Sequence, residues 1–284
     1  MVPVGEWTRP ASTPRMYGIL ATKAPIALIF RRGPSRWFHL LRWRLDTGIL
    51  EPGVWVAKKL FPRRCDLSAD GELLLYYIAG GFEGGYRVLG GISRTPWLRP
   101  LAKWDEHATW GRGSCFVTDG IDHVWDTPRV VQSAGGPMTI QRNNNISFVN
   151  ERRRGWSEAP DCPPRDPSDV WDEHRSVVLH KACDSNGCTL RLISDRSACQ
   201  GAIEGRAPRF ELDLPSGDRI AIRDAAWAEW DHAGRLLVAT TAGHLTIREP
   251  SAAMPWIESH DLSSLTPNPA PPPDWATAAP PRRS

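Results

Sequence analysis

The chain has 284 residues, of which 24% are charged and 41% are hydrophobic, as in a globular protein and unlike a disordered one. Its formal net charge of +3 is small and its basic residues are scattered, which excludes the usual pattern of a nucleic-acid-binding protein. The 24 glycines and 26 prolines suit a chain with many turns and argue against long helices.

The N-terminal region predicts a cytoplasmic protein. Residues 1–15 are polar, contain proline and lack the apolar core of a signal peptide, so we expect a flexible arm. The longest apolar stretch, Ala24–Phe30, is too short to cross a bilayer, and no membrane contact is expected. In the cytoplasm the six cysteines would be reduced thiols.

Signals for β-strands begin at Met16. Short runs of branched and aromatic residues alternate with turns of a few residues, which predicts one antiparallel meander or blade. Its four strands are expected at 16–22, 25–31, 36–45 and 53–60.

A polar turn that ends in glycine precedes an apolar run twice in the chain. The first copy contains Asp70-Gly71 and the second ends at Gly234. A hairpin turn needs the positive φ that glycine adopts easily. A weaker copy lies at Gly111–Val117. The pattern Ser-x-Asp-Gly-x-Leu-Leu-x-Tyr at 68–76 resembles the inner-strand motif of WD40-like and TolB-like β-propellers.

The resemblance implies an all-β fold, a β-propeller of antiparallel blades. Residues 31–77 are also similar to a group of bacterial proteins without an established activity. Such repeats take about 40 to 50 residues each, so a body spanning 16–260 would hold about five blades. Further strands are expected at 176–181, 188–194, 210–214, 218–223 and 244–248.

Two regions depart from this pattern. Residues 127–169 are rich in glycine, asparagine, arginine and proline, and we expect an irregular insertion there with one or two strands, such as 146–151. The tail 261–284 is rich in proline and alanine, which predicts an extended or disordered segment that Trp275 could anchor.

The tetrapeptide Trp-Asp-Glu-His occurs at 104–107 and again at 171–174. Alternate residues of a strand share a face, so Asp105 could act with His107 and Asp172 with His174. If both pairs met at a central channel, they could serve a hydrolase or lyase, or bind zinc or iron. In the simpler interpretation, tryptophan packs between blades while aspartate and histidine bond within turns.

A second set of metal-ligand types follows. His180, Cys183, Cys188 and Cys199 lack the paired C-x2-C spacing of zinc ribbons, so idle thiols are the simpler interpretation and no metal is expected. Cys183 and Cys188 flank a predicted hairpin turn at 184–187 and could pair if oxidised. Nucleophile and phosphate-loop motifs are lacking, and no cofactor is expected.

The 14 tryptophans suggest either core packing or an aromatic binding surface. The candidates for such a surface are Trp37, Trp55, Trp97 and Trp110. The run Arg152–Arg154 is interpreted as a solvated loop rather than a phosphate site. Together these features favour a non-catalytic binding or scaffold module for a protein partner or a small ligand. The alternative is the hydrolase or lyase.

Overall fold

The computed structural model describes residues 13–106, 113–117, 129–133, 136–142, 148–164, 176–195, 203–204 and 207–277. Within this part of the chain, regular structure is almost all β: five sheets with antiparallel pairing, and only short helices. The all-β class predicted from the sequence is confirmed.

The first sheet is the meander expected after Met16. Its strands follow one another in chain order: β1 (Arg15–Leu20), β2 (Ile26–Arg32), β3 (Phe38–Arg44) and β4 (Leu50–Val56). The predicted strand over 53–60 is wrong at its C-terminal end. The chain leaves the first sheet after Val56, because Leu60 is buried in the second sheet, where it pairs with Ile78.

The second sheet contains the turn at Gly71, whose φ of 76° confirms the predicted positive value. The turn joins the short strand β6 to a long hairpin, and a 3-10 turn precedes β6. The elements are β5 (Lys59–Leu60), η1 (Pro62–Arg64), β6 (Asp66–Leu67), β7 (Leu73–Phe82), β8 (Gly85–Arg94) and β9 (Pro100–Glu106).

The third sheet is small and is followed by a short helix. Its strand order is β10-β12-β11, so the hairpin of β11 and β12 folds back onto β10. The elements are β10 (Ser114–Phe116), β11 (Arg129–Ser133), β12 (Gly136–Arg142) and α1 (Val149–Arg153). The predicted strand at 146–151 is therefore wrong, because residues 149–151 are helical.

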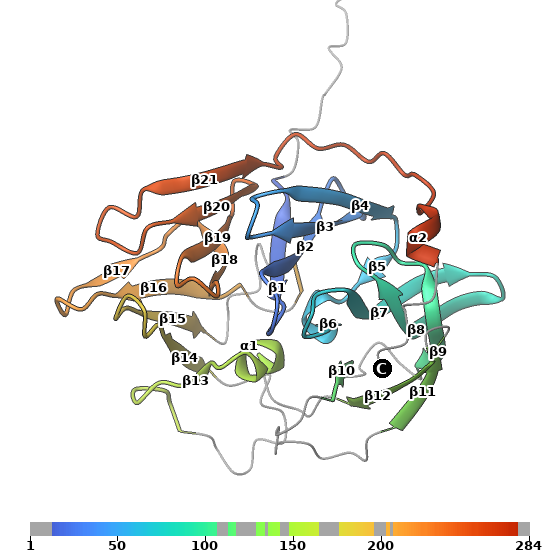
Figure 1. Cartoon of the computed structure of the whole chain (residues 1–284), viewed down its shortest axis with the longest axis horizontal. Helices are drawn as coiled ribbons and strands as arrows, with labels where there is room; N and C mark the ends of the chain where they lie inside the picture. Colours follow the sequence, from blue (N-terminus) through green and yellow to red (C-terminus); the bar gives the residue numbers. More distant parts are fainter. Residues whose placement is uncertain are drawn as a thin grey trace, which may run out of the picture.

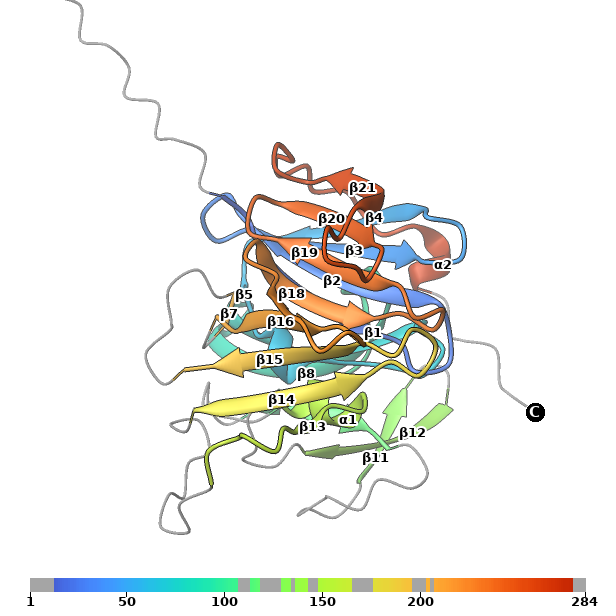
Figure 2. The ribbon, with the colours of Figure 1, turned by 90° about the vertical axis from the view of Figure 1, so that its left-hand side faces the viewer.

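The fourth and fifth sheets are again meanders in chain order. The fourth consists of β13 (Ser157–Glu158), β14 (Val177–Ala182), β15 (Thr189–Ser194), β16 (Arg209–Asp213) and β17 (Arg219–Ala221). The fifth consists of β18 (Ala225–Trp230), β19 (Leu236–Thr240), β20 (His244–Arg248) and β21 (Trp256–Asp261). Figure 2 shows the strands of these two sheets above one another, from β21 down to β13.

Figure 1 shows how the sheets are arranged. The inner strands β1, β6 and β10 and the helix α1 lie toward the middle of this view, and β4, β9, β17 and β21 lie toward the outside. Neighbouring sheets touch through their inner strands: β1 contacts β18 and β6, and β6 contacts β10. Gly18 allows the close approach of β1 to β18, since an added Cβ would lie 2.7 Å from the Trp227 ring.

Two main hydrophobic clusters lie between the sheets. The larger one joins the first, second and fifth sheets around fully buried side chains such as Tyr17, Phe30 and Trp43. The other joins the fourth and fifth sheets around Leu190, Phe210 and other residues. Burial of such side chains on folding contributes the main stabilising free energy.

The segment after β21 runs along the body of the protein. In Figure 1 this red segment passes over the first sheet and ends in α2 (Asp274–Thr277), near β8. The buried Arg31 side chain holds its start by donating hydrogen bonds to the carbonyl oxygens of Leu262, Ser263 and Leu265 at 2.7, 3.3 and 3.0 Å. Further on, the Trp275 ring lies 5.8 Å from the Arg42 guanidinium.

A buried histidine lies beside Arg31 in the first sheet. The His39 ring stacks on Trp55 with their centroids 4.2 Å apart, and His39 is only 3% exposed. Burial, together with the nearby charge of Arg31, lowers the pKa of His39 to about 4.

Acidification should therefore destabilise the fold through His39. Between its pKa of 6.5 in the unfolded chain and about 4 in the folded one, only the unfolded chain binds the proton. The stabilisation is present above the unfolded pKa and is lost as the pH falls, by about 2 kcal/mol between pH 7 and pH 5. Urea unfolding at both pH values measures this loss. The His39→Phe variant should lose correspondingly less stability over this pH range. Equal losses in the variant and the wild type would contradict the assignment of the effect to His39.

Candidate functional site

A network of buried ion pairs joins α1 to the inner strands. Asp66 of β6, with a side chain only 3% exposed, accepts hydrogen bonds from Arg153 and Arg154, each at 3.0 Å. It also accepts the backbone N–H of Phe116 in β10 at 2.9 Å. Arg154 additionally donates to the carbonyl oxygen of Leu20 at 2.7 Å. One carboxylate thus ties three separate parts of the chain together.

A second carboxylate of the network lies on α1 itself. Glu151 accepts hydrogen bonds from the Tyr17 hydroxyl at 3.2 Å and from Arg63 at 2.9 Å. Burial, followed by the charge of Glu151, raises the pKa of Tyr17 above its usual range, so its hydroxyl stays protonated. Burial opposes the charge of Arg63, but Glu151, Tyr17 and Glu204 outweigh it and raise the pKa of Arg63.

The third carboxylate of the network belongs to Glu229 of β18. Its carboxylate accepts hydrogen bonds from the Trp156 indole and the Lys181 ammonium group, both at 2.9 Å. Glu229 is 3% exposed, so all of its charge compensation comes from inside the protein. The segment 148–156 is therefore held by ion pairs to Asp66 on one side and by a hydrogen bond from Trp156 to Glu229 on the other.

This network corrects the interpretation of Arg152–Arg154 as a solvated loop. The side chains of Arg153 and Arg154 are only 13% and 7% exposed, and both pair with Asp66. Buried arginines need partners that satisfy their charge, and these partners come from distant parts of the sequence. Asp66 precedes Arg153 by 87 residues, so the local sequence gives no signal of the pairing.

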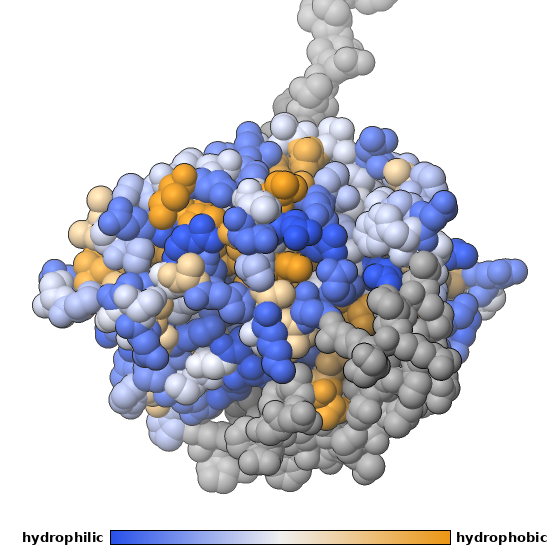
Figure 3. All heavy atoms as spheres, viewed as in Figure 1, coloured by the Kyte–Doolittle hydropathy of each residue, from blue (hydrophilic) through white to orange (hydrophobic). Residues whose placement is uncertain are grey.

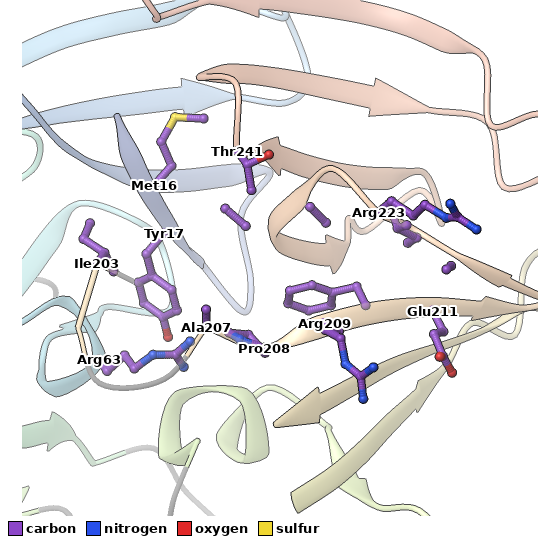
Figure 4. A pocket seen from close by; sticks show the side chains of 15 residues that line it. Met16, Tyr17, Arg63, Ile203, Ala207, Pro208, Arg209, Glu211, Arg223 and Thr241 are labelled. Atoms are coloured by element: carbon purple, nitrogen blue, oxygen red, sulfur yellow. The ribbon is translucent and has the colours of Figure 1, made fainter. Parts of the chain in front are cut away.

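A cavity of about 460 Å³ opens beside the network, where β1, β16 and β18 approach one another (Figure 4). We call it the arginine cavity. Its apolar lining includes Met16, Ile203, Phe210 and Ile222, each at most 6% exposed. Small-ligand sites commonly have such volumes and such mainly apolar walls with a few polar groups.

Three arginines from different elements supply the positive charge of this cavity: Arg63 of η1, Arg209 of β16 and Arg223 after β17. Arg63 pairs with Glu151, and Arg209 pairs with Asp195 at 3.0 Å. Arg223 is exposed and makes no ion pair or hydrogen bond within the described part of the chain. The local sequence gives no signal for any of these arginines, because the cavity brings them together from three separate regions.

A second cavity of about 470 Å³ lies at the other end of the inner strands. Leu20 and Trp230, the C-terminal residues of β1 and β18, line this second cavity. The N-terminal parts of the same two strands line the arginine cavity. Its cations Arg153, Arg154 and Lys181 already pair with Asp66 or Glu229. The arginine cavity therefore has the more available positive charge.

The Asp and His candidates are only partly described. Asp105 lies on β9, the outermost strand of its sheet, and its exposed carboxylate pairs with Arg87 at 2.8 Å. It therefore lies away from the inner strands. His107, Asp172 and His174 lie outside the described residues, so the pairs of the tetrapeptides stay predictions.

The predicted turn between Cys183 and Cys188 is confirmed. The Cys183 N–H donates to the Cys188 carbonyl oxygen at 2.8 Å, and both cysteines are free. Burial, and then the charge of Cys183, raises the pKa of Cys188. His180 lies on β14, and Cys199 is outside the described residues. Within the described ranges, no three histidine, cysteine or acidic side chains are grouped as metal ligands would be.

Of the tryptophans expected to form a surface, three lie among the residues described. Trp55 is buried against His39, Trp37 and Trp97 are half-buried, and Trp110 is outside the described residues. The exposed indoles are instead Trp256 and Trp275, at 53% and 44%. On the face in Figure 3, apolar side chains form small separate groups between hydrophilic ones.

No protein-family model matches this chain, and no match to a curated protein is found. Across the described ranges, no helix is both long enough and apolar enough to pass through a bilayer.

Proposed function

We propose that the five sheets are the blades of a β-propeller. Four observations support this arrangement: the sheets follow the chain order, the first, fourth and fifth are meanders, β6 contacts both β1 and β10, and the first sheet packs on the last through β1 and β18. The glycine turns are also equivalent, since Gly71 and Gly234 each precede the second strand of a sheet, β7 and β19, with φ of 76° and 74°. The WD40-like and TolB-like resemblance of 68–76 agrees with this proposal.

We further propose that the protein is a non-catalytic binding module that takes a small ligand in the arginine cavity. The observation that carries this proposal is the cavity itself, which combines about 460 Å³ with apolar side chains and three arginines in its lining. A rigid frame of sheets would hold the lining in place, and this reduces the entropy lost on binding.

Binding is favoured over proton-transfer catalysis by the chemistry of the lining. Arginines stay protonated near neutral pH, and burial raises the pKa of Tyr17, so these groups orient a ligand rather than exchange protons with it. Asp105, the described member of the catalytic candidates, is on an outer strand. The hydrolase or lyase is therefore the weaker hypothesis, and a protein partner stays a prediction.

Filling the cavity should abolish binding of a small apolar probe. Ala221 is an exposed residue of β17 that lines the cavity, so Ala221→Phe should be tolerated by the fold while its ring occupies ligand space. We expect the wild type to bind the neutral dye N-phenyl-1-naphthylamine at one saturable site, and the variant to bind it at least about tenfold more weakly. Fluorescence titration measures both constants.

The matched control is Ala252→Phe, which adds the same ring at an exposed residue that does not line the cavity. It should bind the dye as the wild type does. Lack of dye binding by the wild type, or equal binding by both variants, would refute the assignment of the ligand site to this cavity.

A further inference from the structure

The arginine cavity also indicates what kind of ligand it would take. Resting on the proposed function, we propose that the ligand is a small organic acid with an apolar aliphatic or aromatic body and a single negative charge. Its body would lie against Met16, Phe210 and Ile222, and its carboxylate would lie near the lining arginines.

The interior selects for an apolar body. Phe210 of β16, Ile222 directly after β17 and Met16 of β1 all line the cavity. These side chains are at most 3% exposed and present no charge to a ligand. A sugar or a polyphosphate would lose its hydration here without replacement hydrogen bonds, which is costly.

The arginines of the lining select for negative charge. Arg63, Arg209 and Arg223 outnumber Glu211, the carboxylate that lines the cavity. Glu211 lies 3.8 Å from both Arg191 and Arg219, which are outside the cavity and pair more closely with Asp161 and Asp213, so its charge is partly compensated away from the cavity. The planar guanidinium group matches a carboxylate with two parallel hydrogen bonds.

The number of lining arginines without a carboxylate partner indicates a monoanion. Arg63 and Arg209 each have a carboxylate partner, Glu151 and Asp195. Arg223 has none in the described part of the chain, so its guanidinium group is available to one ligand carboxylate. Arg63 also retains a buried Nε–H that finds no acceptor among the described residues, and a ligand oxygen could satisfy it.

The test is competition against bound N-phenyl-1-naphthylamine, using a pair of ligands that differ only in charge: 2-naphthoate and 2-naphthylmethanol. We expect 2-naphthoate to displace the dye at a concentration about tenfold lower, as a charge-assisted hydrogen bond would give. Decanoate, with 1-decanol as its neutral partner, distinguishes an aliphatic body from an aromatic one.

The variant Arg223→Gln should remove most of this preference. It should weaken the binding of 2-naphthoate about five- to tenfold and leave the binding of 2-naphthylmethanol unchanged. Arg209→Gln gives a second variant with the same expected direction. Arg36→Gln is the matched control, because Arg36 is also exposed and lies outside the cavity lining.

The outcomes separate this inference from the proposed function. Dye binding with equal displacement by acid and alcohol, with displacement by neither, or with equal weakening of both ligands in Arg223→Gln, would overturn the organic acid and keep the cavity as a ligand site. Failure of the wild type to bind the dye would overturn the proposed function, and the inference with it.

Discussion

Replacing Asp66 with asparagine should lower the free energy of unfolding by about 3 to 5 kcal/mol. The change leaves the buried guanidinium groups of Arg153 and Arg154 without the carboxylate on which both depend. An uncompensated buried charge is far more costly than a lost surface contact. Urea unfolding followed by circular dichroism measures the difference.

The control for this prediction is Asp105→Asn, which breaks the pair between Asp105 and Arg87 at the surface. Solvent screens that pair, so the unfolding midpoint should not change measurably. A loss below about 1 kcal/mol in Asp66→Asn would contradict the role of Asp66 as the charge partner of α1.

Replacing Arg31 with methionine should cost about 3 kcal/mol and loosen the segment after β21. Its guanidinium donates to the carbonyl oxygens of Leu262, Ser263 and Leu265, and also to Gly33 at 2.7 Å. Several charge-assisted hydrogen bonds are lost at once, and carbonyl groups remain without their donors. Unfolding experiments give the cost, and hydrogen exchange of the amides at 262–265 reports the loosening.

Arg36→Met serves as the comparison, because Arg36 is exposed in the turn between β2 and β3. It should leave both stability and exchange near wild-type values. If Arg31→Met destabilised the fold while exchange at 262–265 stayed unchanged, Arg31 would act within the first sheet and would not hold the C-terminal segment.

Both variants test contacts that secondary-structure patterns could not predict. The pattern of apolar residues and turns did predict most strands, since these signals are local. The strand expected at 244–248 coincides with β20, and the turns at Gly71 and Gly234 have the predicted positive φ. The strand expected at 53–60 went wrong because the decisive contact, Leu60 with Ile78, belongs to another sheet.

The site was less accessible to sequence reasoning. The Trp-Asp-Glu-His units contain residue types known for chemistry, but Asp105 lies on an outer strand. The cavity is built from arginines and apolar residues that are individually ordinary. Arg63 and Arg223 are 160 positions apart in the sequence. They line the same cavity only because of the way the sheets pack.

The sequence by itself determined the all-β class, the hairpin turns and most strand positions, because hydrophobic periodicity and glycine conformation act over a few residues. Tertiary structure alone decided that Arg153 and Arg154 are buried and that α1 forms in place of a strand. It also decided that Arg63, Arg209 and Arg223 share one cavity. The physical reason is that a buried charge is stable only beside its partner, and the fold brings that partner from a distant part of the chain.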